Sequence, residues 1–226
     1  MAGFFFATGA LAADVGVVKI ALAGDSTVTE YPKESSTRGW GQEIGSLLKE
    51  NVKISNFAVG GRSTKTFIAE GRWEKLLASK PDIILLQFGH NDAHGKGKPE
   101  STDAPTDYKD YLRKYADDAK QAGVKLVFIT SMHRRTFEKD GKPSEELLPY
   151  AAAMKEVAAE KGLPLVDLNT SSGKLIAELG EEKAVELYCS ASDRSHFSEK
   201  GAVKMASLIV EGLKQADPEL ALKIVK

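Results

Sequence analysis

The stretch VVKIALAGDST, residues 17–27, decides the fold. Its first part is almost entirely apolar and runs directly into Gly24, Asp25 and Ser26. A short apolar run without polar alternation is typical of a strand buried on both faces of a parallel sheet. We therefore predict a buried strand at residues 17–23, with Ser26 in the loop at its carboxyl end.

Four further apolar runs are bounded by turn residues in the same way. They predict strands at residues 52–59, 82–88, 124–130 and 163–168. Segments with helical spacing of apolar residues lie between or after them, at 40–48, 108–115, 147–159 and 203–213. This alternation predicts βα units joined by right-handed crossovers, and therefore a single α/β domain at residues 14–226 with helices on both faces of one open sheet.

Composition excludes several classes of protein. The 226 residues are 42% hydrophobic and 28% charged, as in globular proteins, which excludes collagen-like and wholly disordered chains. The 31 Lys and Arg against 32 Asp and Glu give a net charge of -1, so we expect neither nucleic acid nor a membrane surface as a partner. Cys189 is the only cysteine, which excludes an intrachain disulfide. The composition leaves the oligomeric state open.

The first thirteen residues, MAGFFFATGALAA, are apolar and end in small side chains. This pattern resembles the end of a secretion signal with its cleavage site, although the basic residues that normally begin such a signal are absent. We expect residues 1–13 to be either a signal remnant or an N-terminal arm. The first reading predicts a secreted or periplasmic protein, and the second allows a cytoplasmic one.

Long irregular segments follow three of the predicted strands, at residues 25–38, 89–106 and 132–144. In open α/β sheets, ligands bind beyond the carboxyl ends of the strands. These loops should therefore share one rim, where the functional residues are expected.

Ser26 is a candidate nucleophile, because its hydroxyl would project from a strand end into this rim. The alternative is a purely structural role, in which the Ser26 side chain stabilises a turn or caps a helix. Two further strand ends carry candidate hydrogen-bond donors for an anion. The backbone N–H of Gly60 or Gly61 would be free in a glycine turn, and Asn91 has a side-chain amide.

Asp193 and His196 are three residues apart, just before a predicted helix that begins near Ser198. At this spacing the carboxylate can bond one imidazole nitrogen and leave the other free as a base. Taken alone, a pair so close in sequence carries little information. The position of this pair in the chain, after a candidate nucleophile and two loops with candidate donors, favours a catalytic role.

The motifs GDS at residue 24, a glycine after the second strand, GHND at residue 89 and DRSH at residue 193 together resemble the SGNH hydrolase superfamily, also called GDSL-like. Further segments resemble its rhamnogalacturonan acetylesterases, namely GDSTVTEY from residue 24, RGWGQ from residue 38, NFAVGGRST from residue 56, MHRRTF from residue 132 and DRSHFSEKGA from residue 193.

The resemblance implies a flavodoxin-like, three-layer α/β/α domain with five parallel strands. It also implies hydrolysis of acetyl esters on acetylated pectin, without a metal or an organic cofactor. By motif, Ser26 corresponds to the nucleophile, Asp193 and His196 to the orienting acid and the base, and Gly61 and Asn91, with the amide of Ser26, to the oxyanion hole.

Four arginines lie in the predicted rim loops, at positions 62, 134, 135 and 194. Guanidinium groups suit the carboxylates of galacturonate, so Arg62, Arg134 and Arg135 are candidate substrate contacts. Trp40 could stack on a sugar face, although it also begins an apolar helical stripe.

Other functions remain open at this point. His90, Asp92, His94 and His133 could be assembled into a metal site, and Asp25 could be a phosphotransferase nucleophile. The chain could also be a carbohydrate-binding relative without turnover. Among enzymes, the alternative is an SGNH esterase for another acyl substrate, such as acetylated xylan, a small lipid or a thioester.

Overall fold

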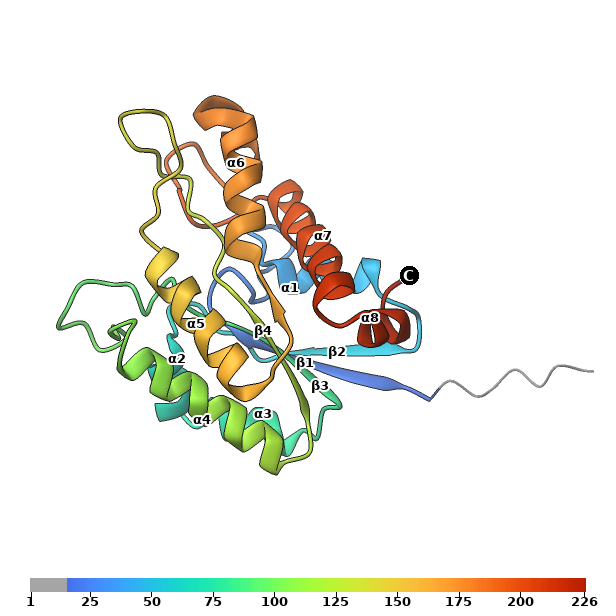
Figure 1. Cartoon of the computed structure of the whole chain (residues 1–226). Coiled ribbons are helices and arrows are strands. Elements are labelled where there is room, and N and C mark those ends of the chain that lie inside the picture. Colours follow the sequence, from blue (N-terminus) through green and yellow to red (C-terminus); the bar gives the residue numbers. More distant parts are fainter. Residues whose placement is uncertain (1–15) are drawn as a thin grey trace, which may run out of the picture.

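The sheet at the centre of the molecule is parallel throughout, with the strand order β2-β1-β3-β4-β5 (Figure 1). The computed structural model describes residues 16–226. Its strands are β1 (Val18–Gly24), β2 (Val52–Asn56), β3 (Ile83–Gln87), β4 (Lys125–Ile129) and β5 (Leu165–Val166). The expectation of a flavodoxin-like sheet is confirmed. The order reverses between β1 and β3, which is where ligands bind in such sheets.

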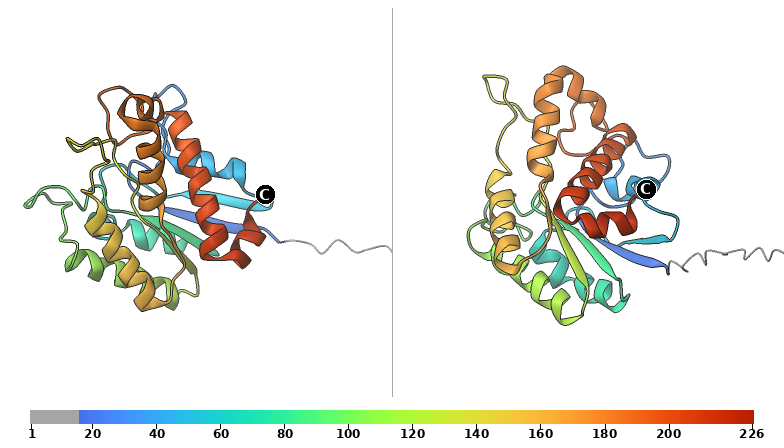
Figure 2. Two further views of the ribbon diagram at one scale, coloured as in Figure 1. Left: turned by 45° about the horizontal axis from the view of Figure 1, so that its top comes forward. Right: turned by 45° about the vertical axis from the view of Figure 1, so that its right-hand side comes forward.

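Two helical layers cover the sheet, as Figures 1 and 2 show. The first comprises α1 (Trp40–Glu43), the 3₁₀ helix η1 (Ile44–Leu47), α6 (Leu168–Ala184), η2 (Val185–Leu187), α7 (Glu199–Ala216) and α8 (Pro218–Ile224). The second comprises α2 (Thr64–Ala69), α3 (Arg72–Ala78), α4 (Asp107–Gln121) and α5 (Leu148–Lys161).

Alternation along the strands explains why both layers form. In β1, Ile20 and Leu22 pack against the α7 layer, whereas Ala21 and Ala23 pack against the α4 layer. All four side chains are fully buried, at 0–1% exposure. Because both faces are buried, the strand needs apolar residues at consecutive positions, which is the pattern that predicted it.

The predicted helices at residues 108–115, 147–159 and 203–213 are present as parts of α4, α5 and α7. Ser198 is the N-cap of α7, and its hydroxyl accepts a hydrogen bond from the N–H of Gly201. The predicted helix at 40–48 is instead a short α-helix followed by a 3₁₀ turn. Within residues 16–226 no helix is long and apolar enough to span a membrane. The expected signal remnant at 1–13 lies outside the described residues.

Gly201 fixes how α7 approaches the segment that precedes it. A Cβ atom at this position would lie 1.8 Å from the carbonyl oxygen of Leu187, which is a backbone atom that cannot turn aside. The same segment continues to His196, so this contact helps to set where the imidazole stands.

We predict that Gly201→Ala destabilises the protein by about 2 kcal/mol or more, because an added atom in a close-packed contact forces the backbone apart. Urea unfolding measures the change. Lys204→Ala, on an exposed position of the same helix, is the control and should change stability by no more than about 0.5 kcal/mol. Equal stability of the two variants would contradict this account of Gly201.

Candidate active site

Ser26 stands on a tight turn directly after β1. The carbonyl oxygen of Asp25 accepts hydrogen bonds from the N–H groups of Val28 and Thr29, both at 3.1 Å. The chain must fold back closely at Gly24, where a Cβ atom would lie 2.4 Å from a methyl group of Val28. The turn therefore presents the serine at the carboxyl edge of the sheet.

A chain of hydrogen bonds joins three of the predicted site residues. The Oγ atom of Ser26 lies 3.0 Å from Nε2 of His196, and Nδ1 of the same ring lies 2.9 Å from Oδ2 of Asp193. These distances allow the imidazole to take the serine proton while the carboxylate holds the ring.

Asp193 is held in its ionised form by its own turn. Its Oδ1 accepts hydrogen bonds from the N–H groups of Ser195 and His196, both at 2.8 Å. Burial raises the pKa of Asp193, but these backbone hydrogen bonds and the one from the His196 ring outweigh it and lower the pKa to about 2. The carboxylate is therefore charged at neutral pH.

Arg135 clamps the loop that carries this acid. Its Nη2 donates to the carbonyl oxygens of Ala191 and Asp193, at 2.6 and 3.1 Å, and its guanidinium lies over the ring of Tyr188. Its backbone N–H donates to the carbonyl oxygen of Arg194. Arg135 is only 2% exposed, so the expectation that it binds substrate is wrong: its donors face the protein.

Backbone and side-chain donors gather beside Ser26. A Cβ atom on Gly60 would lie 3.4 Å from Cβ of Ser26, which places this glycine directly beside the nucleophile, and Gly61 has a positive φ of 79°. The backbone N–H groups of Ser26, Gly60 and Gly61 donate no hydrogen bond to residues 16–226. Nδ2 of Asn91 donates one of its two hydrogens to the carbonyl oxygen of Arg62, at 2.9 Å.

Asp92 joins the two loops that carry these donors. It is fully buried and accepts hydrogen bonds from the backbone N–H and the hydroxyl of Thr64, next to the glycine turn. The hydroxyl of Thr102 donates to the same carboxyl group, at 3.0 Å. The sequence had offered Asp92 only as a possible metal ligand, and its role between the two loops becomes visible in the structure.

A buried chain of hydrogen bonds supports the nucleophile turn from behind. Nε1 of Trp40 donates to Oε1 of Gln87 at 2.8 Å, and Nε2 of Gln87 donates to Oγ1 of Thr27 at 2.7 Å. Thr27 in turn donates its hydroxyl and its backbone N–H to Oδ1 of Asp25. Because Trp40 is 0% exposed, the expectation that it stacks on a sugar is wrong.

Asp25 and His90 form a second, looser pair beneath the turn. Oδ2 of Asp25 lies 3.8 Å from Nδ1 of His90, and neither atom has a hydrogen-bond partner in the described part of the chain. Burial raises the pKa of Asp25 and lowers that of His90 well below its usual value, so burial favours the neutral form of each. An inaccessible Asp25 is not placed for nucleophilic attack, which removes the phosphotransferase alternative.

The remaining candidates are partly exposed at the rim. The guanidinium of Arg62 pairs with Glu70 at 3.1 Å and bonds the carbonyl oxygen of Gly60. That of Arg134 pairs with Glu146 and bonds the carbonyl oxygen of His90. Substrate contact by these two arginines stays a prediction.

The metal-site alternative gains no support from the geometry. Among residues 16–226, no three His, Cys, Asp or Glu side chains form a group that could hold a metal ion. His94 instead bonds Glu100, at 2.7 Å.

The fold and the hydrogen-bonded chain from Ser26 to Asp193 together define an SGNH hydrolase, as the motifs predicted. The chain belongs to the GDSL-like Lipase/Acylhydrolase family, whose model matches residues 22–203.

Several known proteins are similar over most of the chain. The probable rhamnogalacturonan acetylesterase YesY of Bacillus subtilis is 40% identical, and the match covers 92% of this chain and 97% of that protein. The rhamnogalacturonan acetylesterase RhgT of the same organism is 37% identical, covering 88% and 90%. Among solved structures, YXIM of Bacillus subtilis is 28% identical with a TM-score of 0.78, covering 89% of this chain and 57% of that chain.

The raised pKa of Asp92 predicts how the free energy of unfolding changes with pH. Burial raises its pKa to about 7, against hydrogen bonds from Thr64 and Thr102 that lower it. Between about pH 4 and pH 7 the folded protein then keeps a proton that the unfolded chain has released, so this contribution to stability falls as the pH rises. Relative to Asp92→Asn, which cannot titrate, the wild type should lose up to about 4 kcal/mol of unfolding free energy across this window.

Urea unfolding at several pH values between 4.5 and 7.5 measures the difference between the two proteins. Asn keeps one oxygen that can accept a hydrogen bond from Thr64 or Thr102, so it is the closest replacement in shape. Parallel stability curves for the two proteins would show that Asp92 does not titrate in this range.

The hydrogen bonds of Arg135 to the Asp193 loop predict that kcat depends on this arginine. Arg135→Ala leaves the carbonyl oxygens of Ala191 and Asp193 without their donor, so the carboxylate that orients His196 loses its support. We expect kcat for an aryl acetate to fall about tenfold or more, equivalent to about 1.4 kcal/mol in the barrier. Steady-state kinetics measure it, with Arg72→Ala as the control, because the partly buried Arg72 pairs with Glu70 on the protein surface and has no contact with the Asp193 loop. If a folded Arg135→Ala protein has an unchanged kcat, Arg135 does not position the Asp193 loop for catalysis.

Proposed function

We propose that this protein is a serine esterase that removes acetyl groups from rhamnogalacturonan. The observation that carries the proposal is the hydrogen-bonded chain from Ser26 through His196 to Asp193. The substrate follows from the relatives: two proteins named as rhamnogalacturonan acetylesterases are 37% and 40% identical along nearly the whole of both chains.

In the proposed reaction, Oγ of Ser26 attacks the acetyl carbonyl carbon as Nε2 of His196 takes its proton. Asp193 keeps its charge throughout and stabilises the imidazolium that forms. The imidazolium then gives the proton to the departing sugar oxygen, which leaves the acetyl group on Ser26. Water attacks this acetyl-enzyme, with His196 again as the base, and acetate leaves as Ser26 recovers its proton.

Three donors are proposed for the negative oxygen of each tetrahedral intermediate. They are the backbone N–H groups of Ser26 and Gly61 and the second hydrogen of the Asn91 amide. The first two have no acceptor in the described part of the chain, and Asn91 is held by Arg62. Each preorganised donor of this kind contributes about 3 kcal/mol to the stabilisation of the transition state.

Three substitutions test the assignment of these roles. Ser26→Ala and His196→Ala should each lower kcat for an aryl acetate by about 10⁶, and Asp193→Asn by about 10⁴, because the nucleophile and the base remain in the third variant. Ser192→Ala, an exposed position in the same loop as Asp193, is the control and should retain full activity. Retained turnover in Ser26→Ala would disprove the nucleophile.

Acetate release from a panel of acetylated polymers tests the substrate. Rhamnogalacturonan should be the preferred polymer over acetylated xylan. Xylan is the competing candidate because an acetylxylan esterase of Xylanibacter ruminicola is 24% identical, with 43% of that protein matched. A preference for xylan would move the proposal to that substrate and leave the catalytic residues unchanged.

A further inference from the structure

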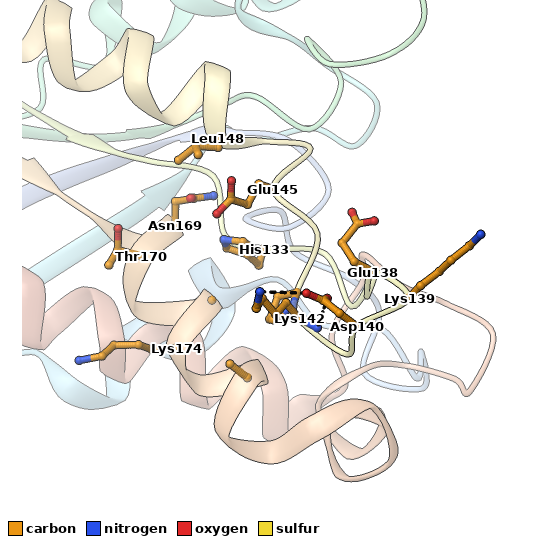
Figure 3. Close-up of a pocket in the computed structure, with 13 residues that line it drawn as sticks. His133, Glu138, Lys139, Asp140, Lys142, Glu145, Leu148, Asn169, Thr170 and Lys174 are labelled. Carbon is orange, nitrogen blue, oxygen red and sulfur yellow. Dashed lines mark hydrogen bonds and ion pairs between the residues drawn. The ribbon is translucent and has the colours of Figure 1, made fainter.

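A cavity of about 990 Å³ lies between the loop after β4 and helix α6 (Figure 3). One wall comes from residues 133–148 and the other from residues 169–177. Neither Ser26 nor His196 lines it, so it is separate from the acyl site. Its size falls in the range of pockets that bind small molecules, about 300–1,000 Å³.

One segment of chain serves both the cavity and the candidate active site. His133 lines the cavity, whereas the two residues after it do not. Arg134 donates to the carbonyl oxygen of His90, and Arg135 donates to that of Asp193. A ligand in the cavity would therefore contact the same chain segment that positions groups of the acyl site.

The wall at His133 is fixed by close packing. The backbone N–H of His133 donates to Oγ of Ser172, at 2.9 Å. A Cβ atom on Gly173 would lie 2.7 Å from Nε2 of the His133 ring, so the glycine allows α6 to touch the imidazole. The cavity is thus formed before any ligand arrives, which limits the entropic cost of binding.

The lining combines the groups that a sugar ring needs. Glu145 and Lys174, both labelled in Figure 3, line it with exposed charged groups, and Leu148 and Ala177 add apolar surface. Carboxylate and ammonium groups can bond sugar hydroxyls, while apolar side chains accept the C–H face of the ring.

The charges around the cavity are balanced. Three carboxylates line it, from Glu138, Asp140 and Glu145, and so do three ammonium groups, from Lys139, Lys142 and Lys174. Lys142 is paired with Asp140 at 2.9 Å, as the dashed line in Figure 3 marks. Without a net charge, the cavity does not concentrate ions of either sign, which favours recognition through hydrogen bonds.

We propose that this cavity is an accessory saccharide subsite, which holds one sugar residue of the polysaccharide backbone while another residue presents its acetyl group to Ser26. This inference rests on the proposed function, because only a polymeric substrate reaches both places. The subsite gives the enzyme binding energy from a part of the substrate that does not react.

The test compares two substrates of the same enzyme. Ala177 is exposed on α6 and lines the cavity, so Ala177→Trp fills it without disturbing the core. The ratio of kcat/KM for acetylated rhamnogalacturonan to kcat/KM for p-nitrophenyl acetate should fall tenfold or more. Lys174→Ala removes one hydrogen-bonding group and should lower the same ratio by about fivefold.

Glu178→Trp is the matched control, since it adds the same ring at the neighbouring exposed position that does not line the cavity. It should leave the ratio unchanged. If Ala177→Trp has the same ratio of kcat/KM values as the wild type, the subsite proposal is wrong, while the proposed esterase function still stands. Hydrolysis of p-nitrophenyl acetate by the wild type with no acetate released from the polymer would overturn the proposed polysaccharide substrate, and the subsite with it.

Discussion

The structure of the site depends on the hydrogen bond between Oγ of Ser26 and Nε2 of His196, which joins residues 170 positions apart. Such a contact cannot form from local structure. It requires a sheet that brings the end of β1 beside the start of α7. The parallel order, with β1 at the reversal between β2 and β3, provides this arrangement.

The turn that carries Ser26 is held in position by polar groups buried beneath the carboxyl edge of the sheet. Trp40, Gln87 and Thr27 form a hydrogen-bonded series that ends on Asp25, one residue before the nucleophile. Buried polar groups are costly unless they are bonded, so this series specifies one arrangement of the turn. The same reasoning applies to Asp92, which joins the glycine turn to the loop that carries Asn91.

Sequence patterns were informative about the sheet and the reacting groups. Short runs of consecutive apolar residues, as in β1 and β3, are typical of strands buried on both faces, and the residues that follow parallel strands meet at one edge. Helix α6 was missed because its first turns contain Ser171, Ser172 and Gly173, which weaken the helical pattern, and because it breaks at Gly180, where φ is 70°.

Residues that position others were harder to predict. Arg135 and Trp40 have the chemistry of sugar-binding side chains, and sequence cannot tell whether a guanidinium or an indole faces solvent or the interior. Burial decided both cases: at 2% and 0% exposure, each bonds to protein groups. Asp92 was considered only as a metal ligand, because its partners Thr64 and Thr102 are distant from it in sequence.

The 170-residue separation of Ser26 and His196 also matters during synthesis. A growing chain releases its nucleophile from the ribosome long before its base, and the α7 helix that covers the sheet emerges after all five strands. Nascent polypeptide therefore has no means of activating the serine. Hydrolytic capacity therefore appears only after residue 196 has been added and α7 has packed on the sheet.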